Sequence, residues 1–375
     1  MMKNNCISNK QIKEQNGCPG CKASHGGDVY RNDVSLDFSV NLNPLGVPGS
    51  IRQAALTGLE EVTQYPDPFH FELRSAIAEC EQTDPERIVC GSGASELIMA
   101  SVHAFMPKTA LMTAPCYSGY ETALKAAGTE VREYPLDESL GFRLDEGALD
   151  QITDSTDMVF LTDPNNPNGS LIDDGLLIKI VKKCEECHAV LMIDECFLPL
   201  TDAGSSYYLR MQDRIHNRGT VLHLRAFTKT FAIPGIRIGY IVSDDTEALE
   251  TIRMHLPEWN ISRIAEKAGA AAARALSDHS YLNEAVCMIS RERTYLTGEL
   301  EALGIKVYPS DVNYLLFRSV PGLYEKLLGQ GILIRRCANF HGLDDSCYRI
   351  AVRRHEENEI LINTLKKCLS AEEYE

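Results

Sequence analysis

The sequence predicts an α/β fold: a mostly parallel, seven-stranded sheet with helices on both faces, followed by a smaller α+β part. From about residue 50 to 280, apolar strand-like runs alternate with helical patterns, which is typical of sheets whose parallel strands are joined by helices. The runs at 157–163 and 189–194 are almost continuously apolar, as expected for strands covered on both faces. After about residue 282 the pattern changes to a long helix, short strands and a terminal helix.

These elements divide the chain into three regions. We expect an N-terminal arm at 1–34, a large domain at 35–281 and a small domain at 282–375, with the N-terminal segment packing near the small domain. An open α/β sheet builds its site from loops at the carboxyl ends of its strands, so functional residues are sought there. The predicted strands of the large domain are 87–91, 109–114, 130–136, 157–163, 189–194, 220–227 and 237–243, and its predicted helices lie around 94–106, 117–127, 172–187 and 245–256.

Composition narrows the class of protein. The 375 residues carry a formal net charge of −16, which disfavours binding to nucleic acid or to an anionic membrane, because both are polyanionic. No apolar run approaches the roughly 18 residues that a membrane span requires. The first 17 residues are polar and lack the apolar stretch of a signal peptide. The sequence therefore predicts a cytoplasmic protein.

The 13 cysteines do not form the framework of a small secreted domain. Most are expected to be buried, reduced thiols. Cys184 and Cys187 stand one helical turn apart in a helical pattern, where two ordinary thiols are the favoured interpretation. Cys18 and Cys21 lie in a Gly- and Pro-rich segment near His25 and would suit a metal or a redox pair. A metal site usually needs four ligands, and no second pair has zinc-like spacing, so a simple N-terminal arm and no metal are predicted.

The predicted strand ends carry polar residues that share one chemistry. Asn166 follows 157–163 in a Pro- and Gly-stiffened turn, Asp194 ends the next strand, Thr228 and Lys229 end a third, and Arg237 follows eight residues later. A charged residue at the end of a buried strand is costly without a partner. Pyridoxal 5'-phosphate (PLP) accounts for all of them, because it needs an amine for its aldehyde, a carboxylate for its pyridine nitrogen, a donor to its ring oxygen and a cation for its phosphate.

At this point the sequence resembles a known family. The motifs PNNPNG, IDECF and TKTFAIPGIRIGY, in this order, resemble those of fold-type I PLP-dependent enzymes of the class I/II aminotransferase group. The resemblance runs from about residue 24 to 370. It implies that Lys229 binds PLP covalently and moves protons at the substrate Cα, that Asp194 pairs with the pyridine nitrogen, that Asn166 contacts the ring oxygen and that Arg237 binds the phosphate. An intact lysine argues against the alternative of a binding module without chemistry.

The resemblance also implies roles for residues outside these motifs. In GSGASEL, the amides of Ala94 and Ser95 would hold the cofactor phosphate at a helix start. In APCYSGY, Tyr117 would stack on the ring, with Tyr120 as the weaker candidate. Tyr65 in QYPDP is similar to a tyrosine that reaches the phosphate from a neighbouring subunit, which implies a homodimer. Thr228 is counted with the cofactor-binding residues.

Three departures from the family pattern affect the prediction. Ala226 stands where the family often has a hydroxyl residue, so that contact must be lost or taken by Thr228. Asn168 replaces the threonine of the usual NPTG. Phe197 replaces a tyrosine that would donate to the ring oxygen. Loss of that donor should change the electronics of the ring and favours a reaction other than ordinary transamination.

The substrate is predicted from the two ends of the chain. The segment from His25, with its His-Gly-Gly opening, and RRCANFHGL near the C-terminus are similar to threonine-phosphate decarboxylases of cobalamin synthesis, and less so to histidinol-phosphate aminotransferases. That resemblance implies that Arg349, Arg335 and His25 hold the substrate carboxylate and phosphate, with Asn41 nearby. The prediction is decarboxylation of L-threonine O-3-phosphate. The alternative is an aminotransferase acting on histidinol phosphate or an aromatic amino acid.

Overall fold

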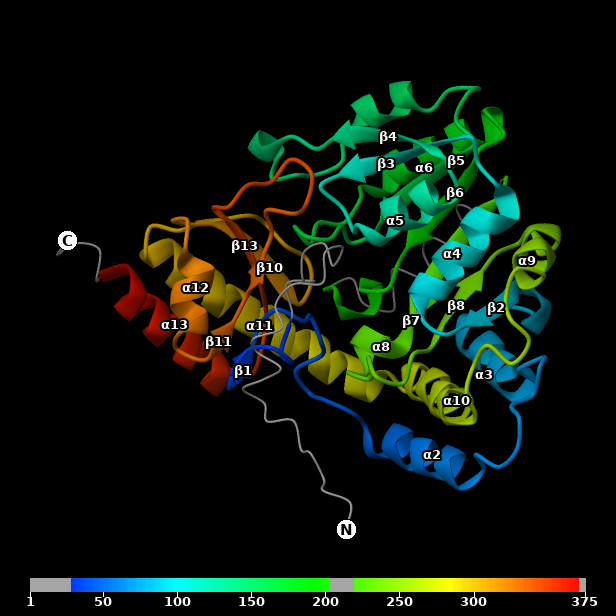
Figure 1. The fold of residues 1–375 in the computed structure, drawn as a ribbon, viewed down its shortest axis with the longest axis horizontal. Helices are drawn as coiled ribbons and strands as arrows, with labels where there is room; N and C mark the ends of the chain where they lie inside the picture. Colours follow the sequence, from blue (N-terminus) through cyan, green and yellow to red (C-terminus); the bar gives the residue numbers. More distant parts are fainter. Residues whose placement is uncertain (1–27, 203–218, 371–375) are drawn as a thin grey trace, which may run out of the picture.

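The computed structural model describes residues 28–202 and 219–370, and its core is a seven-stranded sheet (Figure 1). The strands are β2 (Ile88–Gly91), β3 (Thr109–Ala114), β4 (Glu130–Pro135), β5 (Met158–Thr162), β6 (Val190–Asp194), β7 (Val221–Ala226) and β8 (Gly239–Val242). Their order across the sheet is β2-β8-β7-β6-β5-β3-β4. β8 is antiparallel to both of its neighbours, and the remaining pairs are parallel. The predicted α/β class with a mostly parallel sheet is confirmed.

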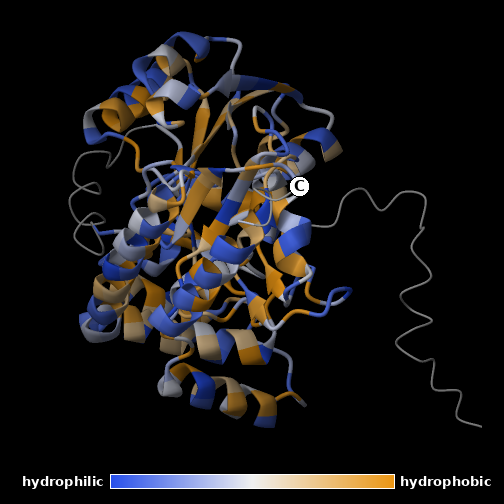
Figure 2. Ribbon diagram, turned by 90° about the vertical axis from the view of Figure 1, so that its left-hand side faces the viewer, coloured by the Kyte–Doolittle hydropathy of each residue, from blue (hydrophilic) through white to orange (hydrophobic). Residues whose placement is uncertain are grey.

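Both faces of the sheet are buried under helices. Along β5, Met158 and Phe160 belong to one apolar cluster, whereas Val159 and Leu161 belong to another, because successive side chains of a strand point to opposite faces. Figure 2 shows the strands as an apolar interior behind helices of mixed polarity. No helix in the described residues is long and apolar enough to cross a membrane. The apolar cluster with Met158 and Phe160 also contains residues of α4 (Ala94–Phe105), α5 (Gly119–Ala126) and α9 (Thr246–Arg253). The cluster with Val159 and Leu161 contains residues of α6 (Asp174–Glu186).

Three further helices pack together next to β2, and a fourth, α11 (His279–Ala302), contacts elements of the C-terminal part. α10 (Arg263–Ser277) packs against α2 (Gly49–Glu60) and α3 (Phe71–Glu81). A Cβ at Gly269 of α10 would lie 2.8 Å from Leu73 Cδ1, so a glycine permits the close approach of α10 to α3. α11 is a single helix of 24 residues. It therefore runs without interruption through the predicted boundary between residues 281 and 282.

The C-terminal part contains a four-stranded antiparallel sheet, which we call the C-terminal sheet. Its strand order is β12-β13-β10-β9. Nearby, β1 (Leu36–Asp37) pairs in parallel with β11 (Ile332–Leu333), and Phe38 is fully buried among apolar residues of this part. The remaining elements are β9 (Lys306–Val307), β10 (Tyr314–Arg318), α12 (Leu323–Leu328), β12 (Arg335–Arg336), β13 (Cys347–Ala351), α13 (His355–Ser370) and the short α8 (Phe227–Thr230) that follows β7.

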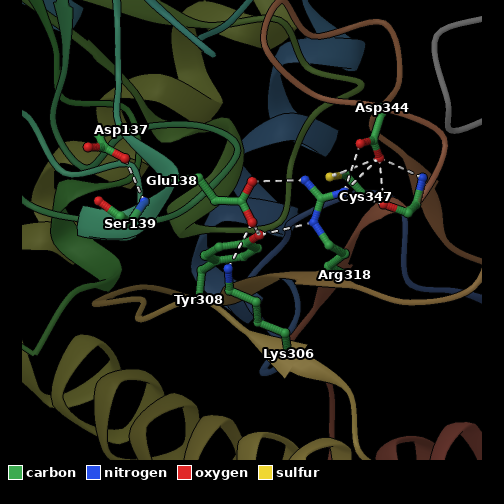
Figure 3. A network of polar contacts seen from close by, with 9 residues as sticks. Asp137, Glu138, Ser139, Lys306, Tyr308, Arg318, Asp344 and Cys347 are labelled. Carbon is green, nitrogen blue, oxygen red and sulfur yellow. Dashed lines mark hydrogen bonds and ion pairs between the residues drawn. The ribbon is translucent and has the colours of Figure 1, made fainter.

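A network of charged groups joins the C-terminal sheet to the loop after β4 (Figure 3). Glu138 in that loop accepts hydrogen bonds from Lys306 Nζ at 2.8 Å and Tyr308 Oη at 2.6 Å. It also pairs with Arg318 at 3.0 Å, and Arg318 in turn pairs with Asp344. The bond from Lys306, with those from Tyr308 and Arg318, lowers the pKa of Glu138 to about 2. These contacts hold the large sheet and the C-terminal sheet side by side, with the candidate site between them.

Candidate active site

A cavity of about 290 Å³ lies where β5, β6 and β7 end and where β12 and β13 approach them. Parallel strands present their carboxyl ends at one edge, so residues far apart in the chain converge there. Most of the residues predicted from the sequence line this cavity: Asn41, Ala94, Ser95, Tyr117, Asn166, Asp194, Thr228, Lys229, Arg237, Arg335 and Arg349. The cavity is therefore the candidate active site.

Asp194 is the buried carboxylate of the cavity, at the end of β6. Its Oδ1 accepts a hydrogen bond from the Cys196 amide at 3.0 Å, and its Oδ2 accepts one from Tyr120 Oη at 2.7 Å. Burial raises the pKa of Asp194 despite these bonds, since burial disfavours the charged form of a carboxyl group. A buried carboxylate of this kind is stabilised by a cationic partner in the cavity, such as a protonated ring nitrogen.

Lys229 lies in α8 with its amine directed into the same cavity. Its Nζ is 5.7 Å from the centroid of the Phe197 ring and has no hydrogen-bond partner among the described residues. Burial, together with the positive charges of Arg349 and Arg237, lowers the pKa of Lys229 to about 8. A larger fraction of the amine is therefore neutral near pH 7 than for an exposed lysine, and only the neutral amine attacks a carbonyl carbon.

The N-terminus of α4 and Arg237 form a cradle suited to a phosphate. The N-cap of α4 is Gly93, so no side chain caps the first amides of the helix, which begins at Ala94 and Ser95. Gly93 has a φ of 83°, and a Cβ there would lie 2.5 Å from Arg237 Nη2. Only glycine therefore permits the guanidinium to reach the helix start. Free helix amides and a nearby cation are the donors that bind a phosphate group.

The two tyrosines after β3 differ in position. Tyr117 lines the cavity, and a Cβ on Gly119 would overlap its ring. Tyr120, the weaker candidate for stacking on the cofactor, does not line the cavity: its ring stacks on Phe160 with centroids 5.1 Å apart, and its hydroxyl contacts Asp194. Tyr120 therefore acts on Asp194, a contact that the sequence motifs did not indicate.

The loop after β5 places Asn166 against the C-terminal sheet. Asn166 Oδ1 accepts a short hydrogen bond from Arg349 Nη1, which leaves its amide nitrogen as the available donor. Asn168, the departure from the usual threonine, is fully buried and donates to the carbonyls of Gly141 and Phe142 at 3.1 and 2.9 Å. The replacement is thus accommodated, because the amide holds the loop by hydrogen bonds that a threonine has fewer groups to make.

Two arginines of the C-terminal sheet face the cavity from adjacent strands. Arg335 in β12 and Arg349 in β13 are opposite each other in the register, and both are buried. Neither is paired with a carboxylate in residues 28–202 and 219–370. Burial and the neighbouring Arg349 lower the pKa of Arg335 to about 10, and burial lowers that of Arg349. Two like charges held together out of solvent require an anionic ligand.

The structure also locates the predicted residues that do not line the cavity. Tyr65 is 78% exposed and its ring lies 4.7 Å from that of Trp259, so it does not reach the cavity of its own chain. His25, Cys18 and Cys21 fall outside the described residues. Cys184 and Cys187 are buried free thiols, in α6 and directly after it.

Some residues of the cavity were not predicted. Ser39 lines it and its carbonyl accepts a hydrogen bond from Arg349 Nη2 at 3.1 Å. Thr162 and Cys196 also line it, the first as the last residue of β5. Ser39, Thr162 and Cys196 stand close in the sequence to Asn41, Asn166 and Asp194, and this proximity was the available indication. They were not selected from the sequence because none of these three side chains carries a charge.

Known proteins that are similar to this chain identify its family. Residues 34–365 match the family described as aminotransferase class I and II. This chain belongs to the class I and II aminotransferase family. It is 33% identical over 360 residues to the threonine-phosphate decarboxylase of Salmonella typhimurium, across 93% of this chain and 97% of that protein. A histidinol-phosphate aminotransferase of Methanococcus aeolicus is 29% identical, across 90% and 91% of the two chains.

A solved structure is similar throughout the fold. The crystal structure of the histidinol-phosphate aminotransferase from Clostridium acetobutylicum has a TM-score of 0.81 and 35% identity, covering 88% of this chain and 98% of that one. Enzymes of the class I and II aminotransferase family depend on PLP, and this chain is a PLP-dependent enzyme. The comparisons include both decarboxylases and aminotransferases.

The residues of this family member fit PLP. An amine with a lowered pKa, a buried carboxylate with an unmatched charge, an uncapped helix start with a cation beside it, and an amide donor all face one cavity. Lys229 would hold the aldehyde carbon, Asp194 the ring nitrogen and Asn166 the ring oxygen. Ala94, Ser95 and Arg237 would hold the phosphate. When bound, PLP supplies an electron sink for the bond that breaks at Cα.

Proposed function

We propose that this chain removes the carboxylate of L-threonine O-3-phosphate as CO2, with PLP as its cofactor. The observation that carries the proposal is the pair Arg335 and Arg349, two buried guanidinium groups without carboxylate partners in the part of the chain that the structure describes. Arg237 adds a third cation for the cofactor phosphate. A substrate with one carboxylate and one phosphate matches the two remaining cations, since guanidinium groups bind both anions through paired hydrogen bonds.

Each group of the cavity has a defined task in this reaction. Arg335 and Arg349 would hold the substrate anions and so select which bond at Cα is presented to the bound cofactor. Asn41, and His25 from outside the described residues, are proposed to assist them. The Cα–carboxylate bond breaks, its electron pair stays with the substrate and CO2 leaves. Lys229, as an ammonium group, then delivers a proton to Cα, and an aminopropanol phosphate is released. The buried Oδ1 of Asn41 has no partner among the described residues. Because an amide oxygen only accepts hydrogen bonds, this atom supports a contact with a donor group of the ligand, whereas a contact with a substrate anion would use the amide nitrogen.

Phe197 favours decarboxylation over transamination. It lines the cavity, its ring packs edge-on against Tyr314 at 5.1 Å, and it has no hydroxyl to donate. The similarity to threonine-phosphate decarboxylase, 33% over 97% of that protein, points the same way. The second candidate is an aminotransferase acting on histidinol phosphate, and the 35% identity to the Clostridium acetobutylicum structure favours it. Both candidate substrates carry a phosphate, but histidinol phosphate has no carboxylate, so the pair of arginines matches phosphothreonine more fully.

Product analysis separates the two reactions. Purified enzyme is incubated with PLP and either phosphothreonine or histidinol phosphate, each with and without 2-oxoglutarate. We expect CO2 from phosphothreonine in the absence of 2-oxoglutarate. Formation of glutamate from 2-oxoglutarate, without CO2, would show an aminotransferase and overturn the proposal. Lys229→Ala is the control, because it should abolish both products together with the absorbance of PLP bound to the enzyme.

We further propose a homodimer in which Tyr65 contributes to the site of the partner subunit. Tyr65 is exposed and lies against Trp259, and exposed apolar side chains gather in the same stretch, including Val62, Phe69 and Phe71. A set of exposed apolar groups of this kind marks an interaction surface. Tyr65 lies away from the cavity of its own chain, which supports a contribution to the cavity of the partner subunit.

A mixing experiment tests this arrangement. Tyr65→Ala and Lys229→Ala are each expected to be nearly inactive alone. In a mixed dimer with a closed two-fold interface, one site has its own Lys229 and receives an intact Tyr65 from the other subunit. When subunits exchange at random, half of the dimers are mixed and each has one complete site. Mixing should therefore restore about a quarter of the activity per total chain. No recovery in dimers shown to have exchanged would rule out a contribution across the interface.

A further inference from the structure

Two neighbouring arginines in β12 have opposite surroundings. Arg336 is exposed and pairs with Asp345 at 2.5 Å and with Glu325 at 3.6 Å. Arg335, the preceding residue, is buried and lines the cavity. It has no carboxylate partner within residues 28–202 and 219–370. The exposed Arg336 thus has carboxylate partners that balance its charge, whereas the buried Arg335 has none among the described residues. Burial nevertheless makes the charge of Arg335 the more costly of the two.

The groups that hold Arg335 are all neutral. Its Nη2 donates to Asn339 Oδ1 at 2.9 Å, and its Nη1 donates to the carbonyl of Arg336 at 2.8 Å. Its Cζ lies 5.1 Å from the centroid of the Phe340 ring, a favourable position for a cation over an aromatic face. These contacts orient the guanidinium group without cancelling its charge.

A tight turn after β12 brings Asn339 to this position. The Phe340 amide donates to the Cys337 carbonyl at 2.9 Å, which closes a four-residue turn with Asn339 in third place, and the Cys337 amide donates to Cys347 in β13 at 2.9 Å. Asparagine is favoured in turns because its side chain tolerates their backbone conformations. Asn339 is itself exposed and does not line the cavity. It therefore touches Arg335 from behind and does not contact a ligand in the cavity.

We propose that Asn339 is a positioning residue that sets the specificity for phosphorylated substrates: its neutral amide oxygen fixes Arg335 toward the cavity and leaves the full charge of the guanidinium for the substrate anion. This inference rests on the proposed function, in which Arg335 binds the substrate. A carboxylate at position 339 would keep the geometry but compete with the substrate for the same guanidinium. An alanine at position 339 would leave the charge of Arg335 available, but it would remove the hydrogen bond that orients the guanidinium group.

Two substitutions of Asn339 separate charge from geometry. Asn339→Asp has the same shape and should raise the KM for phosphothreonine about 5- to 20-fold with kcat within about twofold, because a partly screened carboxylate then occupies the guanidinium. Asn339→Ala should raise the KM by less, about two- to fivefold, because one oriented hydrogen bond is lost while the charge remains. Asp345→Asn, which alters only the partner of Arg336, is the matched control and should leave the KM unchanged.

Inorganic phosphate provides a second measurement on the holoenzyme. Its inhibition constant against phosphothreonine should rise in the same order, wild type below Asn339→Ala below Asn339→Asp. A merely structural role predicts the reverse order, since aspartate preserves the side-chain shape and alanine does not. Equal KM values for wild type and Asn339→Asp would overturn the inference. If the wild-type enzyme does not decarboxylate phosphothreonine, the proposed function fails. If it does, but the inhibition constant of phosphate is the same in the wild type and in both variants of Asn339, only the inference about Asn339 fails.

Discussion

The pKa of Lys229 sets how fast the apoenzyme takes up PLP at a given pH. Burial and the charges of Arg349 and Arg237 lower it from 10.5 to about 8. At pH 7 about 10% of the amine is then neutral, compared with about 0.03% for a lysine with the ordinary pKa, a ratio of about 300. Because the neutral amine is the reactive form, the rate constant for uptake should rise about tenfold per pH unit below pH 8 and become constant above it.

Arg349→Gln perturbs this pKa directly. Removing a positive charge beside Lys229 raises the pKa of the amine, so the plateau should begin at a higher pH and the rate constant at pH 7 should fall. Arg336→Gln, which changes an exposed arginine of the same sheet, is the matched control and should leave the profile unchanged.

The assay follows the absorbance of apoenzyme mixed rapidly with PLP between pH 6 and 10. Free acetyl-lysine, treated in the same way, corrects for titration of PLP itself. A wild-type rate constant that still rises tenfold per unit up to pH 10, as it does for the free amine, would refute the reasoning. So would identical profiles for wild type and Arg349→Gln.

Three further changes test other parts of the structure. Tyr120→Phe removes the 2.7 Å hydrogen bond to Asp194 and should weaken PLP binding about tenfold, measured by fluorescence titration of the apoenzyme; unchanged affinity would count against a role for Tyr120. Gly93→Ala, at a φ of 83° and against Arg237, should lower PLP affinity while circular dichroism stays native. Glu138→Gln should lower the Tm by about 1 to 3 °C at pH 7. Since the pKa of Glu138 is lowered from 4.5 to about 2, this difference is present above pH 4.5 and should vanish as the pH falls toward 2.

Strands of the large sheet that are buried on both faces, such as β3 and β6, could be predicted closely from their continuous apolar runs. β3 was expected at 109–114 and spans Thr109–Ala114, and β6 was expected at 189–194 and spans Val190–Asp194. α10 was not predicted. Its sequence, RIAEKAGAAAARALS, has a clear amphipathic pattern at helical spacing, so the signal was present in the sequence and was missed. The packing of its buried face against α2 and α3, which are remote in the chain, could not be predicted from that pattern.

In the site, the residues found from the sequence are those that carry a charge or stand in a motif. Lys229, Asp194 and Arg237 could be predicted in this way, and all three line the cavity. The contact of Tyr120 with Asp194 and the role of Asn339 could not. Tyr120 is 74 residues from Asp194 in the chain, and Asn339 acts through Arg335 while lying in an ordinary turn. Their roles depend on contacts through space that local sequence patterns do not encode.

A cationic cavity in a protein of net charge −16 requires that nearby acids be neutralised elsewhere. Glu195 follows Asp194 directly, yet it does not line the cavity: it pairs with Arg225 at 2.7 Å and with His223 at 2.9 Å. Burial alone would raise the pKa of Glu195, but these two partners lower it to about 2. Arg225 also binds the buried Glu81. Asp194 is therefore the one carboxylate lining the cavity in the described part of the chain, and the charges of its arginines remain available to an anionic ligand.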